Sequence, residues 1–318
     1  MNKAFSLLSS IVLLLALFTS CGSASYTETE ITPSNNRYIG ILCDQNDNLH
    51  CFSIKSVENY LDTYFTEKEI THYILKSDLT WDIDTCEWLN EIVDDFPFIN
   101  GKSYNIALTY YQDSIYAVAA MGEYKNDFYY GEKNILYVIE SSNIIYRKEL
   151  KLPTDPSTGS VPYAPKIYVT GKYIALQTLS GICLLDQTGN TLTDTYTVAK
   201  IDALTNDIAL AEYNPDYVEI LNLPTFTSQG LFEATDSYRA YFVDSNIFYT
   251  FTSKGIFQYV IDSRRNSIRH SIAVNEKSFQ FSNEKNQIIG GAVSKCNDFY
   301  VAVVDEKDNV HLYKYSLS

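Results

Sequence analysis

Basic residues are scarce in this sequence. It has 24 Lys and Arg beside 39 Asp and Glu, which gives a formal net charge of −15 at pH 7. Nucleic acids and anionic lipid surfaces select basic patches, so this balance argues against a nucleic-acid partner. The acidic excess is typical of an exported protein that its surface charge keeps soluble.

The motifs that mark common catalytic and cofactor sites are missing. The sequence contains no Gly-x-Ser-x-Gly, no His-Glu-x-x-His, no phosphate-binding loop and no Gly-x-Gly-x-x-Gly. Its four histidines, His50, His72, His270 and His311, form no His/Cys/carboxylate spacing typical of a metal site. We therefore predict no catalytic residue, no metal and no cofactor.

Asp44-x-Asn46-x-Asn48 resembles the opening of a calcium loop, but the Gly and the distal Glu that complete such a loop are absent. Asp and Asn are also the residues that a tight turn needs, and we interpret this segment as a turn.

Long apolar runs are missing with one exception, Ile11–Phe18. This run is shorter than the roughly 20 residues that cross a bilayer, so it predicts a secretory signal over residues 1–20. Phe18-Thr19-Ser20-Cys21 resembles the bacterial lipobox. The resemblance implies lipidation of Cys21, a tether over residues 21–36 and attachment to the membrane by lipid. The protein would then face the extracytoplasmic side of the envelope, on the outer membrane if the cell has one, because Gly22 is no acidic retention signal.

Five cysteines follow Cys21, and an odd number argues against a complete disulfide framework. Cys43 and Cys51 flank one hairpin. A four-residue loop over 45–48 would place Cys43 opposite His50, and only a three-residue, bulged loop would bring the two sulfurs together. The alternative is that these residues are small buried thiols.

Aromatic residues are abundant, with 27 Tyr and 16 Phe, and favour pleated, half-buried surfaces. The segment 172–198 shows the repeating unit most clearly. It predicts three short strands over 173–178, 182–186 and 192–198, separated by turns rich in Gly, Asn and Ser.

The strongest internal match joins the two ends of the chain. Residues 37–54 align with residues 298–315, so that Asp44 matches Asp305 and His50 matches His311. Each copy predicts a hairpin around an Asp-Asn turn. His50 and His311 would share a metal site only where the first and last repeats meet.

The first strands of the repeats are predicted near residues 38, 115, 173, 207, 247 and 299. Their intervals are 77, 58, 34, 40 and 52 residues, and the shorter ones are typical of four-stranded propeller blades. We predict an all-β fold, a single propeller of six or seven blades over residues 37–318, with seven favoured because the longest interval fits two blades. A short helical insertion is predicted around 56–95, where Cys86, Leu89, Ile92 and Val93 fall at helical spacing.

An open array of sheets would leave exposed edges, and a ring removes them when one end of the chain completes the blade made by the other. Residues 27–31 are the predicted closing strand. The pattern resembles the bacterial β-propeller lipoproteins. Asp186-Gln187-Thr188-Gly189 is one residue shorter than the quinoprotein-type repeat, and two Trp are too few for a structural tetrad of the WD type in every blade.

Two functions fit this fold. The first is a binding or scaffolding module for a protein, peptide or glycan, with Tyr129 and Tyr130 as candidate ligand-binding residues because they fall in a long link between two strands. The alternative is a propeller enzyme, a hydrolase or lyase with carboxylates in the central funnel. The missing motifs favour binding.

Overall fold

The protein is seen here in a computed structural model, which describes residues 26–317 apart from 35, 56–63, 66–68, 77, 126–127, 156–160, 162–163, 165, 179, 194–199, 215–216, 234–239, 245, 253, 263–266 and 276–286. The predicted signal peptide, Cys21 and the first part of the tether lie outside the described residues. Within the described residues, no helix is long and apolar enough to cross a membrane.

Six antiparallel sheets make up the described chain. The first is β2 (Arg37–Cys43), β3 (Leu49–Ile54), β4 (Ile70–Leu75) and β5 (Trp81–Asp84). The second is β6 (Ser103–Tyr111), β7 (Ser114–Lys125), β8 (Phe128–Glu140) and β9 (Asn143–Glu149). The third is β10 (Lys166–Val169), β11 (Ile174–Thr178) and β12 (Gly181–Leu185).

The fourth sheet is β13 (Ile201–Leu204), β14 (Ile208–Asn214), β15 (Tyr217–Asn222) and β16 (Thr227–Glu233). The fifth is β17 (Ala240–Asp244), β18 (Ile247–Thr252), β19 (Gly255–Asp262) and β20 (Ser267–Asn275). The sixth is β21 (Gln287–Val293), β22 (Phe299–Val304), β23 (Val310–Leu317) and, from the other end of the chain, β1 (Tyr26–Glu30).

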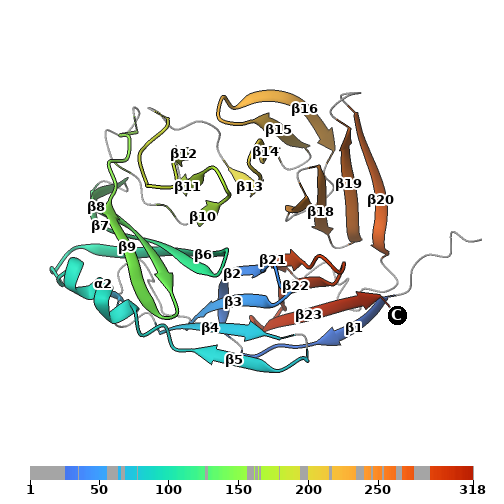
Figure 1. The fold of residues 1–318 in the computed structure, drawn as a ribbon, viewed down its shortest axis with the longest axis horizontal. Coiled ribbons are helices and arrows are strands. Elements are labelled where there is room, and N and C mark those ends of the chain that lie inside the picture. The colour runs from blue at the N-terminus through green and yellow to red at the C-terminus, as the bar shows by residue number, and fades with distance from the viewer. Residues whose placement is uncertain are drawn as a thin grey trace, which may run out of the picture.

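The sheets are the blades of a closed six-bladed propeller (Figure 1). The innermost strands β2, β6, β10, β13, β17 and β21 each contact the next one around the ring, and β21 contacts β2. The all-β propeller prediction is confirmed, but the preference for seven blades is wrong.

The 77-residue interval that suggested a seventh blade is filled by other elements. Residues 70–84 form the outer strands β4 and β5 of the first blade, and the helix α2 (Leu89–Asp95) follows before β6. The start near residue 38 is the innermost strand of its blade, whereas the starts near 115, 173, 207, 247 and 299 are second strands. The interval of 77 residues therefore contains an extra strand and a helix, not a hidden blade.

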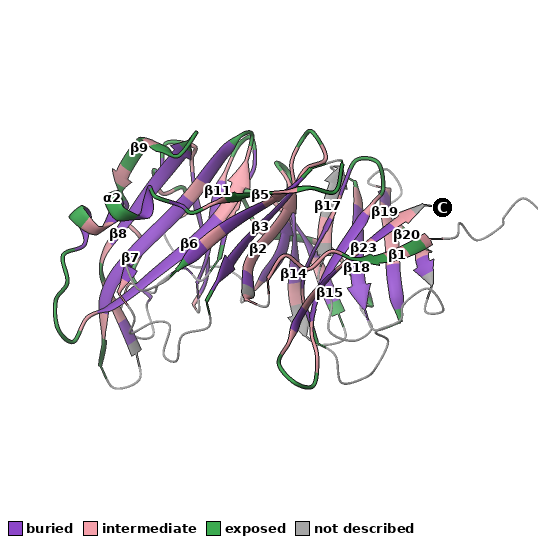
Figure 2. Cartoon of the chain, turned by 90° about the horizontal axis from the view of Figure 1, so that it is seen from below, coloured by how far each residue is buried: buried purple, intermediate pink, exposed green. Residues whose placement is uncertain are grey.

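Strands in the middle of a blade are buried on both faces because blades pack against each other. Every residue of β11 and β12 is buried. Ile174 and Leu176 belong to the core shared with the second blade, whereas Ala175 belongs to the core shared with the fourth. This alternation is the period of two that a strand imposes on its side chains. Figure 2 shows burial along the strands and exposure at turns and outer strands.

One five-residue turn recurs in three blades. In the turns that begin at Asp44, Lys76, Asp186, Ser294 and Asp305, the first residue's amide donates to the fifth residue's carbonyl, and the fourth amide donates back to the first carbonyl. The fourth residue takes a positive φ in each turn, 62° at Asp47 and 73° at Gly189. In the three turns that begin with Asp, the Asp carboxylate also accepts the fifth residue's amide at 2.8 Å.

The matched segments at the two ends share this turn and not their place in the blade. β2 and β3 are the first and second strands of their blade, whereas β22 and β23 are the second and third of theirs. The similarity between residues 37–54 and 298–315 therefore reflects turn chemistry.

Closure of the ring joins the two ends of the described chain. β1 pairs antiparallel with β23, from Tyr26 opposite Leu317 to Glu30 opposite Tyr313. This is the pairing that the sequence predicted for residues 27–31. The Tyr315 hydroxyl donates to Glu28 at 2.5 Å and reinforces the seam.

All five described cysteines are free. Cys43 lies opposite Leu49 and Cys51 lies opposite Ile41. The five-residue turn therefore produces neither the register with Cys43 opposite His50 nor the one that would bring the two sulfurs together. Cys51 is buried, as the interpretation as a small buried thiol requires, and Cys43 is half-buried; burial raises the pKa of both thiols.

Candidate binding groove at the junction of the first and last blades

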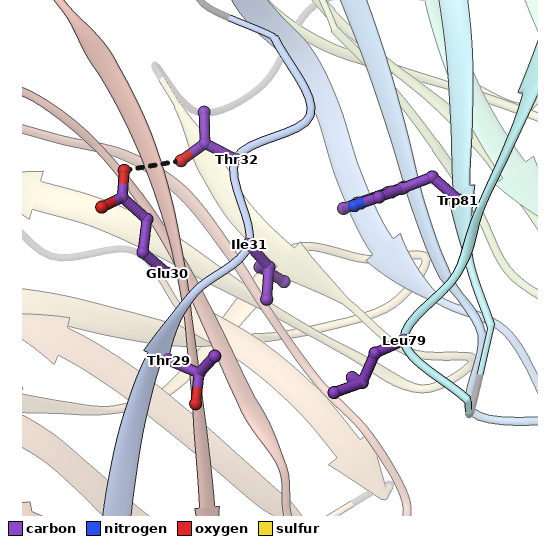
Figure 3. A pocket seen from close by; sticks show the side chains of 6 residues that line it. All are labelled: Thr29, Glu30, Ile31, Thr32, Leu79 and Trp81. Carbon is purple, nitrogen blue, oxygen red and sulfur yellow. Dashed lines mark hydrogen bonds between the residues drawn. The ribbon is translucent and has the colours of Figure 1, made fainter.

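A groove of about 520 Å³ opens on the outer rim of the propeller between β1 and β5 (Figure 3). Its lining is half polar and half apolar: Thr29, Glu30, Ile31, Thr32, Leu79 and Trp81. We call it the junction groove, because the first and the last blade each supply one wall.

The wall from the last blade is held by the end of β1. The Ile31 amide donates to the Leu312 carbonyl at 2.8 Å, and the Leu312 amide donates to Thr32 Oγ1 at 2.9 Å. Thr32 in turn donates to Glu30 Oε1 at 3.1 Å. These bonds fix the backbone where the chain leaves the sheet, so that Ile31 faces the other wall (Figure 3).

The wall from the first blade begins at the turn that starts at Lys76. Its fourth residue is Leu79, with φ 65° and an exposed fraction of 50%. The other four turns place Asp, Gly or Asn at this position. A left-handed conformation costs about 1–2 kcal/mol for an ordinary L-residue, so the backbone conformation of Leu79 is unfavourable for folding. Such strain points to a function outside folding.

Trp81 and Ile83 continue this wall along β5. Trp81 packs at its edge against Tyr73, with ring centroids 6.1 Å apart, and borders the core between the first and last blades. Ile83 is 64% exposed. An apolar strip of Leu79, Trp81 and Ile83 thus runs along the outermost strand of the blade.

The surroundings of the groove are mainly acidic. Asp78 precedes Leu79 in the turn of the first blade, and Asp82 follows Trp81 on the opposite face of β5, where it pairs with Lys76 at 2.6 Å. On the other wall, Glu30 lies 2.9 Å from His311 Nδ1, and Asp305 lies 3.3 Å from His311 Nε2.

The pKa values on this wall move in opposite directions. The hydrogen bond to Glu30 raises the pKa of His311, and the same bond lowers the pKa of Glu30. At neutral pH the groove therefore retains the Glu30 carboxylate beside its apolar residues Ile31, Leu79 and Trp81.

A second contact between the same blades fixes their relative position. Asp47, in the turn between β2 and β3, accepts the Lys295 amide at 2.6 Å and the Cys296 thiol at 3.1 Å. Lys295 Nζ donates to the Gln45 carbonyl at 3.0 Å. The two walls of the groove thus belong to blades that polar contacts hold together.

His50 and His311 follow the same turn but lie in different surroundings. His50 is buried, stacks on Tyr110 of the second blade at 3.7 Å, and its Nδ1 lies 2.9 Å from Nε2 of His72. Burial lowers the pKa of both rings, that of His72 to about 3. His311 lies instead beside Glu30 on the rim, so the two histidines share no site.

Within the described chain, no group of three or more His, Cys, Asp and Glu side chains is arranged to hold a metal ion. The Asp44 oxygens accept hydrogen bonds from Asn46, Asn48 and His50, as the interpretation of this segment as a turn requires.

The candidate ligand residues Tyr129 and Tyr130 lie inside β8 and not in a link between strands. Tyr129 is buried and packs against Tyr124, with ring centroids 5.5 Å apart. A Cβ at Gly122 would lie 2.7 Å from the Tyr129 ring and 2.3 Å from the Tyr130 carbonyl, so the glycine makes room for this packing. Tyr130 is partly exposed, and Lys125 lies 6.0 Å from its ring centre.

Sequence reasoning did not find the junction groove. A signal was present in Lys76–Thr80, where Leu79 stands at the turn position that Asp47 and Asp308 fill elsewhere. Recognising it required the knowledge that these segments share one turn conformation.

No family model matches the sequence, and no curated protein matches it. Among solved structures, the Malassezia sympodialis allergen Mala s 1 gives a TM-score of 0.51 at 10% identity, covering 92% of this chain and 96% of that chain. A chain of the mitotic checkpoint complex gives 0.50 at 6% identity, covering 92% of each chain. The WD40 propeller domain of Doa1 gives 0.46 at 8% identity, covering 93% and 98%. At these identities the likeness is one of fold alone.

Proposed function

We propose that this protein is a lipid-anchored β-propeller on the extracytoplasmic side of a bacterial envelope, on the outer membrane if the cell has one. It acts there as a binding or scaffolding module that holds a protein or peptide partner in the junction groove. Cys21, at the end of the only long apolar run, supports the anchor.

The observation that carries the binding function is Leu79. A bulky apolar side chain is held half-exposed by a left-handed backbone, next to Trp81 and opposite Ile31. Exposed apolar surface framed by polar groups is typical of an interaction site. Aromatic anchors such as Trp supply much of the energy at protein interfaces.

The alternative function, an enzyme with funnel carboxylates, has less support. The six inner strands contain two carboxylates, Asp202 in β13 and Asp244 in β17. These two residues lie on neighbouring inner strands, and the other four inner strands contain no carboxylate. The inner strands therefore favour binding over hydrolysis or elimination.

A photo-crosslinking residue placed at Leu79 tests the proposal in native envelope. The same residue at Leu231 is the matched control, because Leu231 is also 50% exposed but lies on β16 of the fourth blade. We expect a discrete protein adduct from Leu79 and none from Leu231. A glycan partner would give an adduct that glycosidases remove and proteases do not. Equal labelling from both positions, or none from Leu79, would refute the junction groove as a partner site.

A further inference from the structure

The outer edge of β5 has no partner strand among the described elements. The Lys76 amide donates to the Thr80 carbonyl, and β4 pairs with β5 through Leu75 opposite Trp81 and Ile74 opposite Asp82. Antiparallel pairs alternate between hydrogen-bonded and non-hydrogen-bonded. The N–H and C=O groups of Asp82 therefore point toward β4, whereas those of Trp81 and Ile83 point away from β4, toward the free edge.

The two faces of β5 differ in chemistry. Trp81 and Ile83 share the face that looks toward the last blade, since Trp81 borders the core between the two blades. Asp82 and Asp84 share the opposite face, and 53% of the Asp82 side chain is exposed. The side chains of a strand added beside β5 would alternate between the same two faces, because residues at paired positions of neighbouring strands lie on the same face of the sheet.

Resting on the proposed function, we propose that the junction groove takes an extended peptide that pairs with the outer edge of β5 as a fifth strand of the first blade. Its apolar residues lie beside Trp81 and Ile83 and reach the groove. Its alternate residues are Lys or Arg, which lie beside Asp82 and Asp84. Main-chain bonds supply affinity, and the alternation supplies specificity.

Charge and exposure both favour this occupant. Edge strands are usually protected by charge, and Asp82 and Asp84 protect β5 against strands that are themselves acidic or apolar on that face. The two carboxylates do not protect β5 against a strand that carries basic residues on that face. Ile83, at 64% exposure, leaves apolar surface on a free strand edge, and such an edge is a template for pairing with another strand.

The test uses the full mature chain and synthetic peptides with blocked ends. The probe is Lys-Leu-Lys-Val-Lys-Leu-Lys, and the control is Leu-Val-Leu-Lys-Lys-Lys-Lys, which has the same composition without alternation. Ile83→Pro removes the outward amide and keeps the ladder to β4, because proline is tolerated at a strand edge. Ile83→Val keeps the amide.

We expect the probe to bind the native chain at least 10-fold more tightly than the control. We expect the affinity for the probe to fall at least 10-fold in Ile83→Pro and to stay within 2-fold of the native affinity in Ile83→Val.

Hydrogen exchange on the native chain gives a second readout that needs no variant. The probe should slow exchange at the Trp81 and Ile83 amides and leave Asp82 unchanged. Equal binding of both peptides, or an unchanged affinity in a folded Ile83→Pro, would overturn strand addition. Binding to anionic vesicles with no peptide binding would also overturn it. The Leu79 crosslink then decides separately whether the groove holds a partner.

Discussion

Leu79 is the residue at which the requirements of folding and of binding differ most. Asn tolerates the left-handed conformation that the turn imposes at φ 65°, so Leu79→Asn should stabilise the protein by about 1 kcal/mol. Leu231→Asn is the control, because Leu231 is equally exposed but lies within a strand, where Asn is unfavourable. Urea unfolding of the two variants measures the difference. A Leu79→Asn protein no more stable than the native chain would show that the turn carries no strain.

His311 gives the seam between β1 and β23 a dependence on pH. Its pKa is raised above the ordinary 6.5, so its contribution is complete below that value and is lost as pH rises through the folded pKa. The pKa of Glu30 is lowered below 4.5, so its contribution is present above that value and is lost as pH falls. Both contributions are complete between 4.5 and 6.5.

We therefore expect His311→Asn to destabilise the protein more at pH 5.5 than at pH 8.5. Urea midpoints at the two pH values provide the measurement. Glu69→Gln is the control, since Glu69 pairs with exposed Lys55 and involves no histidine. An equal loss at both pH values would mean that the His311–Glu30 pair is not charged in the folded protein.

The helix α2 is fixed to the second blade by a buried carboxylate. Asp95 pairs with Arg147 and accepts the Tyr137 hydroxyl at 2.7 Å, and its side chain is 5% exposed. Tyr137→Phe should cost about 1.5–3 kcal/mol, the usual range for a hydrogen bond to a charged group. Tyr146→Phe is the control, because that hydroxyl donates to the Thr188 carbonyl on the surface. If chemical denaturation gave the same loss in the free energy of unfolding for both variants, this role for Asp95 would be contradicted.

The sequence predicted this helix but not what holds it. Helical spacing placed Leu89 and Ile92 inward, and both are buried in the structure. It gave no reason for Asp95 to be buried, because Tyr137 and Arg147 come from strands about fifty residues further along the chain. Periodicity in the sequence identifies which face of a helix is buried. It does not identify the residues that pack against that face, because these come from other elements of the fold.

β1 should matter as an element and not only as a tether. A soluble chain that begins at residue 33 lacks β1 and its five paired positions with β23. Each lost hydrogen bond contributes about 0.5–1.5 kcal/mol, so we expect a melting temperature at least about 5 °C lower than that of a chain beginning at residue 23. A chain beginning at residue 26 keeps β1 and serves as the control. Equal melting temperatures for all three would refute closure by β1.

At the scale of the whole molecule, the prediction concerns attachment. Cys21→Ser should release the protein into a soluble fraction or leave it unprocessed, because two acyl chains on one Cys are enough for stable anchoring. Cys296→Ser is the control, since Cys296 is exposed and follows no apolar run. Fractionation and mass of the mature protein provide the readout. Normal processing and membrane retention of Cys21→Ser would refute the lipobox interpretation.

The propeller was predictable from the sequence, and its blade number was not. Turn residues and alternating strands repeat strongly enough to reveal an array, as in residues 172–198. A repeat start, however, does not tell which strand of a blade it marks, since all strands use similar residues. The first repeat was recognised by its inner strand and the later ones by their second strands, which lengthened one interval by a strand and a helix.

The pairing of β1 with β23 also sets an order of events during synthesis. Tyr26 is made nearly 300 residues before its partner Leu317, so β1 has no edge to join until β23 has been synthesised. Contacts between such distant segments are slow to form. The five blades between them can assemble first, while β1 has no partner strand. For that interval the ring is incomplete, and a factor that shields unpaired strand edges would be of most use to this protein then.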